Sequence, residues 1–347
     1  MADAGNSSVV GSDAMRGLRG WLICDGKAGM MVQLRGVADA LGLDYDMKIV
    51  KPTGLARVLA PWGPTSSDGK MGGEDGLFAK PFPAIAIATG RASIPYLRKL
   101  RGLLGPSCYT VVLQDPKTGR DTADLIWVPA HDRRRDVNVI TTLTSPHSFS
   151  QQRLSELRSS IPEAVSALSQ PRVAVVLGGK NGIYKFTDAD DDRLGRSLTS
   201  LKELGASFMI TPSRRSHQRL VRTVDAATSD GPRILWNGSG DNPYPSFLAH
   251  ADMLVVTADS VNMTGEACST GRPVYVFSPS GGSAKFQRFH DALQRHGATR
   301  ELPDKFEAFE TWEYDPLNSA ELIAQEICAR WQQRQRVVPG LVQQESS

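Results

Sequence analysis

One stretch, Asp252–Phe277, constrains the fold more than any other part of this chain. Its sequence is DMLVVTADSVNMTGEACSTGRPVYVF. The apolar, β-branched run 253–256 predicts a buried strand. Asp259 and Ser260 are residue types that begin helices, and a glycine such as Gly271 commonly follows the end of one. The stretch therefore predicts a strand, a capped helix and a second strand, which together form the βαβ unit of a parallel sheet.

The start of this predicted helix is a candidate anion site. The first backbone amides of a helix, here around Ser260 and Asn262, lack internal acceptors and attract phosphate. Glu266 lies four residues after Asn262 on roughly the same face, where a carboxylate can accept hydrogen bonds from both ribose hydroxyls. This layout is typical of a nucleotide-diphosphate pocket that includes Asp259. An ordinary βαβ crossover with a solvated glutamate has the same local pattern.

The composition bounds the size of the protein and its partners. The 347 residues are enough for two α/β domains of roughly 150 residues each. Lys plus Arg (40) nearly balance Asp plus Glu (37), so the net charge of +3 gives no indication of a nucleic-acid partner. No apolar run approaches the roughly 20 residues that span a bilayer, and we expect a cytoplasmic location.

The cysteines have no metal-type spacing. We expect all four to be free thiols of a reducing compartment, most of them buried: Cys24, Cys108, Cys268 and Cys328. No group of His, Asp and Glu has ligand spacing either, so we expect no metal site.

Strand and helix patterns alternate along the chain and restart after Gln170-Pro171. This alternation predicts an α/β protein of two Rossmann-like domains that face a cleft. The expected parts are a disordered tail at 1–18, a first domain at 19–170 with a flexible Gly/Pro/Ser-rich insertion at 61–80, a second domain at 171–335, and a tail at 336–347.

In the second half, two polar loops follow predicted strands. Ser213-Arg214-Arg215 offers guanidinium groups that match phosphate oxygens, although a solvated basic loop is the alternative. Gly178-Gly179-Lys180 lacks Walker spacing, but its glycines would let a ligand approach the backbone. A plain turn is equally consistent with those glycines.

In the first half, Asp25 and His131 are the candidate catalytic groups. Asp25 stands in a glycine-bearing loop, Asp25-Gly26-Lys27-Ala28-Gly29, and is a general base or the N-cap of the next helix. The loop lacks the G-x-G-x-x-G spacing of dinucleotide-binding proteins. His131 precedes Asp132 at another strand end, where it is a catalytic base or a residue that braces the cleft.

Several of these segments together resemble one family. They are residues 25–33, 113–138, 242–277, Thr89-Gly90-Arg91 and Ser213-Arg214-Arg215. The chain resembles the mitochondrial-fission family named after elongated mitochondria, whose mostly bacterial members are often labelled glycosyltransferases and sometimes nucleotide-sugar epimerases. That family resembles the GT-B glycosyltransferases in turn.

The resemblance implies a GT-B-like fold with a nucleotide-diphosphate sugar as donor substrate in the second half and no bound cofactor or metal. Glu266, Gly271 and Pro273 match the donor-site pattern of lipid-linked muropeptide N-acetylglucosaminyltransferases. The first half would face an unknown acceptor, for which a lipid-linked molecule at a membrane surface is a candidate. The acceptor-side residues implied are Gly26, Gly29, Gln33, Gly90 and Arg91.

Three functions follow as hypotheses. The leading one is glycosyl transfer from a nucleotide-diphosphate sugar. The others are a binding or scaffold protein of the same fold without catalysis, and a non-hydrolysing nucleotide-sugar epimerase. A basic set, Arg133-Arg134-Arg135 with Lys99 and Arg101, is a candidate for contact with anionic lipid headgroups, or a solvated loop.

Overall fold

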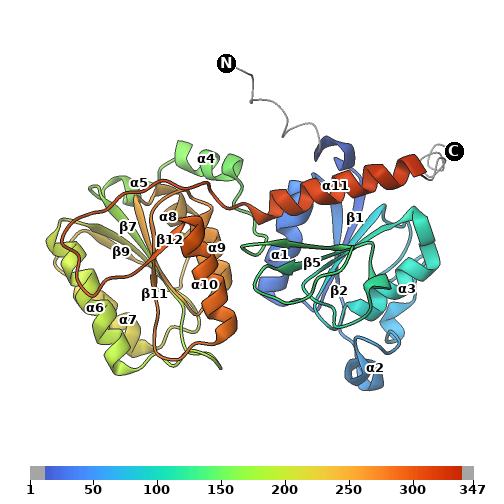
Figure 1. Cartoon of the computed structure of the whole chain (residues 1–347), viewed down its shortest axis with the longest axis horizontal. Helices are drawn as coiled ribbons and strands as arrows, with labels where there is room; N and C mark the ends of the chain where they lie inside the picture. The colour runs from blue at the N-terminus through green and yellow to red at the C-terminus, as the bar shows by residue number, and fades with distance from the viewer. Residues whose placement is uncertain (1–11, 338–347) are drawn as a thin grey trace, which may run out of the picture. The chain divides into compact units, whose positions relative to one another are not determined.

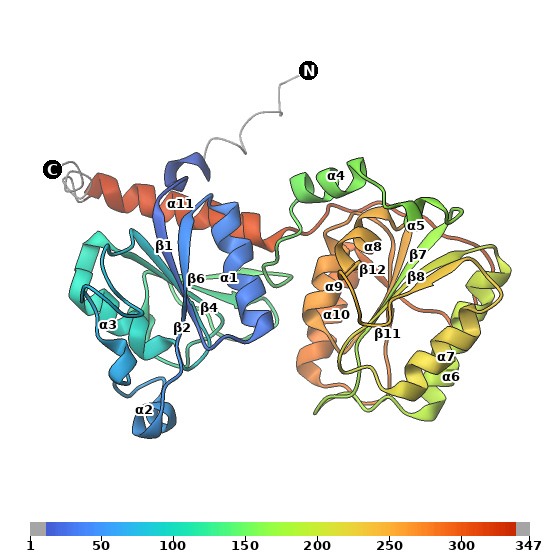
Figure 2. The ribbon, with the colours of Figure 1, turned by 180° about the vertical axis from the view of Figure 1, so that it is seen from behind.

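The computed structural model describes residues 12–337 and contains two separate parallel sheets of six strands each. The chain divides into two compact units (Figure 1). Unit 1 comprises Met1–Ser148 and Asn318–Ser347, and unit 2 comprises Phe149–Leu317. Helices lie on both faces of each sheet in both views (Figures 1 and 2). The α/β class and the division into two sheets confirm the prediction.

The sheet of unit 1 has the order β2-β1-β3-β4-β5-β6. Its strands are β1 (Arg19–Cys24), β2 (Asp44–Ile49), β3 (Ile85–Thr89), β4 (Tyr109–Leu113), β5 (Leu125–Pro129) and β6 (Val139–Thr142). The helices are α1 (Ala28–Ala40), α2 (Gly54–Leu59), α3 (Ile94–Leu104) and α11 (Ser319–Val337), with short 3-10 turns η1 (Ser12–Met15), η2 (Ser67–Gly69), η3 (Gly105–Ser107) and η4 (Arg120–Thr122).

The sheet of unit 2 has the order β12-β11-β10-β7-β8-β9. Its strands are β7 (Arg172–Leu177), β8 (Ser207–Pro212), β9 (Arg233–Leu235), β10 (Met253–Thr257), β11 (Val274–Phe277) and β12 (Thr299–Glu301). The helices are α4 (Gln151–Ser159), α5 (Glu163–Ser166), α6 (Asp188–Glu203), α7 (Gln218–Thr228), α8 (Tyr244–His250), α9 (Val261–Cys268) and α10 (Ala284–His296). The unit β10–α9–β11 matches the strand, helix and strand predicted from the sequence.

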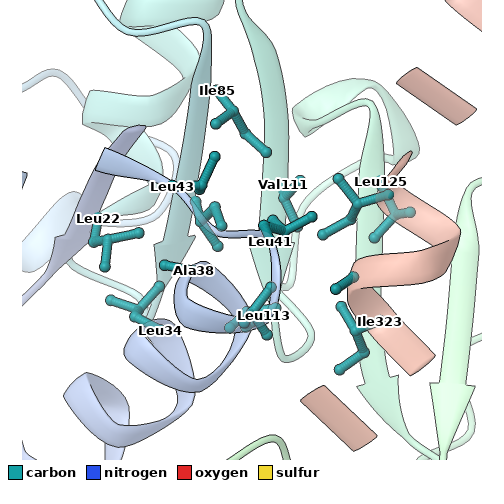
Figure 3. Packing of buried hydrophobic residues seen from close by; sticks show 14 of the residues in the cluster. Leu22, Leu34, Ala38, Leu41, Leu43, Ile85, Val111, Leu113, Leu125 and Ile323 are labelled. Atoms are coloured by element: carbon teal, nitrogen blue, oxygen red, sulfur yellow. The ribbon is translucent and has the colours of Figure 1, made fainter. Parts of the chain in front are cut away.

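The last helix, α11, belongs to unit 1 although the sequence placed it in the second domain. Its Ile323 and Ile327 are fully buried in the core of unit 1, where Ile323 lies in the same cluster as Leu34 and Leu125 (Figure 3). A local helical pattern shows that one face is apolar. It does not show which sheet that face will cover, and this is why the sequence misplaced the helix.

The boundary between the units also differs from the predicted one near residue 170. The chain passes into unit 2 at Phe149, and α4 is fixed there by hydrogen bonds to backbone carbonyls. Arg158 donates to Ala249 O and Thr270 O, at 3.0 and 2.9 Å. Gln170-Pro171 therefore precedes the first strand of unit 2 and does not mark the boundary.

The insertion at 61–80 is anchored in the core of unit 1, which contradicts the expectation of a flexible segment. Phe78 is 0% exposed and stacks on Tyr96, with ring centroids 5.5 Å apart. It also packs against Trp21 at 5.6 Å. The glycine-rich composition correctly predicted a loop. It did not show that the loop is anchored by a buried aromatic side chain, Phe78.

The predicted tails differ partly from the structure. Met15, within the tail expected at 1–18, is the last residue of η1 and is buried in the core of unit 1. Residues 1–11 and 338–347 lie outside the described residues, whereas Arg336 still belongs to α11. Within residues 12–337, no helix combines the length and the apolar character needed to cross a membrane.

Candidate functional site

Unit 2 contains a cavity of about 660 Å³ at the carboxyl ends of its central strands. The last residues of β7 and β8 form its base, and the loops after β8 and β9 and the helices α8 and α9 supply the rest. Its lining residues are Val176, Leu177, Thr211, Pro212, Ser213, Arg214, Trp236, Asn237, Gly238, Asn242, Tyr244 and Met263. Ligands of open α/β sheets bind at this edge of the sheet.

Asp259 connects the loops after the three adjacent strands β10, β7 and β8. Its side chain is fully buried, and Oδ2 accepts from Gly179 N at 3.1 Å and pairs with the Arg215 guanidinium at 2.9 Å. Oδ1 accepts from Thr257 Oγ1 at 2.7 Å. Both carboxylate oxygens are thus occupied by the protein itself, and this carboxylate organises the edge of the sheet.

The glycines of the loop after β7 are explained by contacts within unit 2. A Cβ added at Gly178 would lie 2.0 Å from Asp259 Oδ1, and one added at Gly179 would lie 1.9 Å from Arg215 O. No side chain fits in that space. Asp259 and Arg215 thus account for both glycines, and the approach of a ligand to this loop stays a prediction. Lys180, next in the loop, is exposed and has no described partner.

Arg214 differs from its neighbour Arg215 in being available to a ligand. It is exposed, lines the cavity, and has no ion pair or hydrogen bond to any described side chain. Ser213 Oγ accepts from Arg215 N at 3.2 Å, and Ser216 Oγ donates to Leu177 O at 3.0 Å. These bonds fix the loop that carries Arg214 while leaving its guanidinium free.

The amino end of α9 reaches the same cavity through Met263. Ser260 is the N-cap, and its Oγ accepts from Met263 N at 3.3 Å, whereas Asp259 does not cap this helix. The amides of Val261 and Asn262 have no hydrogen-bond partner among residues 12–337. The free amides predicted from the sequence are present and remain candidates for an anion.

Glu266 lies one side chain behind the cavity wall. Its Oε2 accepts from Tyr244 Oη at 2.6 Å, and Tyr244 itself lines the cavity. The residue is 8% exposed, and burial raises the pKa of its carboxyl to about 7 despite the tyrosine hydrogen bond. Burial, together with the nearby Glu266, also raises the pKa of Tyr244. A ribose could reach this carboxyl only if Tyr244 moved or shared it.

Sequence reasoning missed several residues that line the cavity. Trp236 directly follows β9, and its indole Nε1 donates to Ser239 O at 2.9 Å. Tyr244 lies in the segment 242–277 that carried the family resemblance, which was the available indication. The contact from Tyr244 to Glu266 joins two helices, and no local pattern predicts it.

The two candidate catalytic residues lie in unit 1 and are not neighbours. Asp25 follows β1 and pairs with Lys27 Nζ at 2.6 Å, and Lys27, not Asp25, is the N-cap of α1. His131 follows β5 and is buried. Since β3 and β4 separate β1 from β5, roughly 14 Å lies between those strands. The N-cap alternative for Asp25 is wrong, and the roles of Asp25 and His131 as bases stay predictions.

The predicted acceptor-side residues have mixed surroundings. Gln33 is buried, and its Oε1 accepts from Gln114 Nε2 at 2.8 Å. Gly26 and Gly90 have φ of 84° and 85°, which a residue with a side chain rarely adopts. Gly29 is exposed near the start of α1. Arg91 donates to the carbonyls of Val58 and Ala60, so it braces α2.

The basic set proposed for lipid contact is mostly engaged within unit 1. Arg134 pairs with Asp115 at 2.8 Å and with Asp136 at 3.2 Å. Although burial alone would raise it, hydrogen bonds from Lys117 and Arg134 lower the pKa of Asp115 to about 2. Arg135 donates to backbone carbonyls, Arg101 pairs with Asp124, and Lys99 donates to Gly69 O. These contacts favour the alternative of a self-braced loop.

Cys24, Cys108, Cys268 and Cys328 are free and buried, which confirms the expectation for the thiols. In the described part of the chain, no group of three or more His, Cys, Asp or Glu side chains is arranged to hold a metal ion.

Comparison with known proteins decides the family. The family model described as "Mitochondrial fission ELM1" matches residues 28–331. The chain belongs to this family. It is 29% identical over 281 residues to "Mitochondrial fission protein ELM1" of Arabidopsis thaliana, covering 73% of this chain and 66% of the relative. It is 32% identical over 161 residues to "Uncharacterized protein RP120" of Rickettsia prowazekii, covering 44% of this chain and 45% of the relative.

The matches to these family members cover less than two thirds of each relative's length. Among solved structures, the glycosyltransferase SnogD from Streptomyces nogalater is similar over 94% of this chain and 97% of its own, with a TM-score of 0.50 and 13% identity. At that identity the likeness shows the fold alone. The chain has the GT-B fold, as the resemblance implied.

Proposed function

We propose that unit 2 binds a nucleotide-diphosphate sugar and that the protein is a GT-B-type glycosyltransferase. The cavity at the carboxyl ends of β7 and β8 carries this proposal, because it combines an unpaired arginine, a helix amino end and a buried carboxyl group in one unit. Each of these groups matches one part of a nucleotide diphosphate.

The base and the ribose would lie at the wall formed by Trp236 and Tyr244. The indole of Trp236 offers an aromatic face, and stacking of a base on such a face contributes about 1–3 kcal/mol. Glu266 would accept from the ribose hydroxyls once it is ionised, with Tyr244 sharing or releasing its Oε2. Because the carboxyl of Glu266 has a pKa of about 7, it is ionised only near and above neutral pH. Binding of the ribose by the carboxylate would therefore require neutral or alkaline pH.

The diphosphate would lie between Arg214 and the start of α9. Arg214 supplies a guanidinium, and Val261 and Asn262 supply backbone amides at the positive end of a helix. In the transfer, an acceptor hydroxyl oxygen bonds to the anomeric carbon and loses its proton to a base, while the bond from that carbon to the diphosphate oxygen breaks. The same positive groups then stabilise the nucleoside diphosphate that leaves.

The second candidate is a binding protein of the same fold without catalysis. The observation that favours it is the state of the two predicted bases: Asp25 is held by Lys27 and His131 is buried. The nucleotide site of unit 2 would be retained in this case, and only the transfer step would be lost.

A thermal-shift screen followed by product analysis tests the proposal. We expect ADP, GDP or UDP, and a sugar derivative of the one that binds, to stabilise the protein, by about 2.7 kcal/mol at 100 times the dissociation constant. Sugar transfer to an acceptor or slow hydrolysis of the nucleotide sugar supports catalysis. Binding with an unchanged nucleotide sugar supports the second candidate, and a product that is an epimer of the donor supports neither. Absence of stabilisation by every nucleotide overturns the assignment of the site.

A further inference from the structure

Helix α2 of unit 1 exposes an apolar face. Leu55, Val58 and Leu59 follow the spacing i, i+3, i+4 that normally faces a protein core, and Trp62 lies in the turn that follows the helix. Here they are 76%, 69%, 48% and 64% exposed. The residues that pack inward are small ones on the opposite face, namely Ala56 and Ala60. We call these four exposed residues the α2 apolar face.

This orientation is held by the rest of unit 1 and is not a frayed turn. Arg91 donates to the carbonyls of Val58 and Ala60, and Arg98 Nη1 donates to Trp62 O at 3.4 Å. Arg91 and Arg98 thus bind carbonyls in the last turn of α2 and in the turn that follows it, and these bonds hold the backbone to the rest of unit 1.

The charged side chains at positions 48–67 and 90–104 are all positive, whereas Asp68 lies two residues after Ser66, whose Oγ accepts from Thr53 N just before α2. Lys51 and Arg57 are exposed, and no ion pair or hydrogen bond engages either side chain among the described residues. Arg91 and Arg98 are exposed as well. No acidic residue occurs between positions 47 and 67 or between positions 90 and 104. This differs from the Arg133–Arg135 loop, where neighbouring carboxylates pair with the arginine that is most buried.

We propose that α2 docks unit 1 onto the surface of an anionic lipid membrane. Tryptophan and leucine side chains flanked by Lys and Arg are the composition of a helix that lies in the plane of a membrane interface. Both views show α2 projecting from unit 1 (Figures 1 and 2). It follows β2 by four residues, Val50–Thr53, and so lies near the carboxyl edge of the sheet. This inference does not rest on the nucleotide site of unit 2.

The helix would lie flat with Leu55, Val58, Leu59 and Trp62 in the acyl boundary and the cations at the headgroups. A six-residue helix buries little apolar area, so neither apolar burial nor electrostatic attraction would hold the protein on the membrane alone. Binding therefore needs both contributions, and the electrostatic one weakens as salt screens it.

Sedimentation of the full-length protein with vesicles tests the proposal. The probes are phosphatidylcholine vesicles and phosphatidylcholine vesicles that contain phosphatidylserine. We expect binding to the second kind and about ten-fold weaker binding to the first. The variant Leu55→Ser/Trp62→Ser and the variant Lys51→Glu/Arg57→Glu should each lose about ten-fold or more in partition. Leu322→Ser, an exposed leucine on α11, is the matched control and should bind like the parent.

The two variants change exposed side chains and should melt like the parent, which a thermal scan checks. Equal partition of parent and both variants overturns the proposal, and so does absence of parent binding to either kind of vesicle. Light scattering tests whether a second copy of the protein binds the α2 apolar face instead. If the parent is a dimer that Leu55→Ser/Trp62→Ser separates, and vesicles are not bound, the α2 apolar face is an interface between copies and the proposal is wrong.

Discussion

Replacing Glu266 by glutamine should stabilise the protein at alkaline pH and leave it nearly unaffected in acid. Burial raises the pKa of this carboxyl from 4.5 to about 7 in the folded protein. A carboxyl whose pKa is raised by folding contributes most stability below pH 4.5, and that contribution is lost as the pH rises through about 7. The difference in pKa corresponds to a loss on the order of 3 kcal/mol in the free energy of unfolding.

Glu266→Gln removes this loss, because glutamine has the shape of the protonated acid and its oxygen can still accept from Tyr244. Urea unfolding of parent and variant at pH 5 and pH 8 measures the effect. We expect the variant to gain on the order of 3 kcal/mol over the parent between the two pH values. The same change at the exposed Glu203 is the control and should show little dependence on pH.

If parent and Glu266→Gln differ in the free energy of unfolding by the same amount at pH 5 and pH 8, the reasoning is refuted, because Glu266 would then be ionised at both.

The same variant also tests the proposed contact between Glu266 and the ribose. If the carboxylate reads both hydroxyls, Glu266→Gln should weaken ribonucleotide binding about ten-fold or more at pH 8, since each charged hydrogen bond contributes about 1.5–3 kcal/mol. Binding of 2′-deoxy analogues should differ less between parent and variant.

Three further substitutions test individual contacts. Asp259→Ala should cost about 1–3 kcal/mol in urea unfolding, because it leaves the buried Gly179 N without its acceptor; no measurable loss would contradict this. Phe78→Ala should cost about 3–5 kcal/mol, whereas no change would show that the 61–80 segment is not anchored. Trp236→Ala should weaken nucleoside diphosphate binding by about 1–3 kcal/mol and leave pyrophosphate binding unchanged; equal losses for both ligands would rule out stacking.

Much of unit 2 could be predicted because the residues that begin and end its elements lie close together in the sequence. The run 253–256, Ser260 and Gly271 lie within one short stretch, and the observed β10 and α9 begin where these residues place them. The polar loops at 178–180 and 213–215 were found in the same way, since each follows a strand. Strand order then brings these loops together at one edge of the sheet.

The contacts that define the candidate site were not predictable in this way. Gly178 has no side chain because of Asp259, which is 81 positions later in the chain. Glu266 is covered by Tyr244, which belongs to another helix. Likewise the exposed face of α2 has the same apolar spacing as a buried helix, and only the packing of its neighbours decides which side faces solvent. Hydrophobic periodicity predicts a helix or strand and its apolar face. Whether that face packs against the core or faces solvent depends on tertiary contacts.

The proposed function requires that Arg214 and the start of α9 hold the diphosphate of a nucleotide in unit 2. Calorimetric titration of ADP, GDP and UDP and of the corresponding nucleosides into parent and Arg214→Ala tests it most directly, with Arg196→Ala, an exposed arginine on α6, as control.

We expect at least one nucleoside diphosphate to bind the parent and the control alike. Arg214→Ala should weaken that diphosphate about ten-fold or more and the nucleoside hardly at all, because a charge-assisted hydrogen bond contributes about 1.5–3 kcal/mol. Equal losses for diphosphate and nucleoside, or no binding of any nucleotide to the parent, would contradict the account.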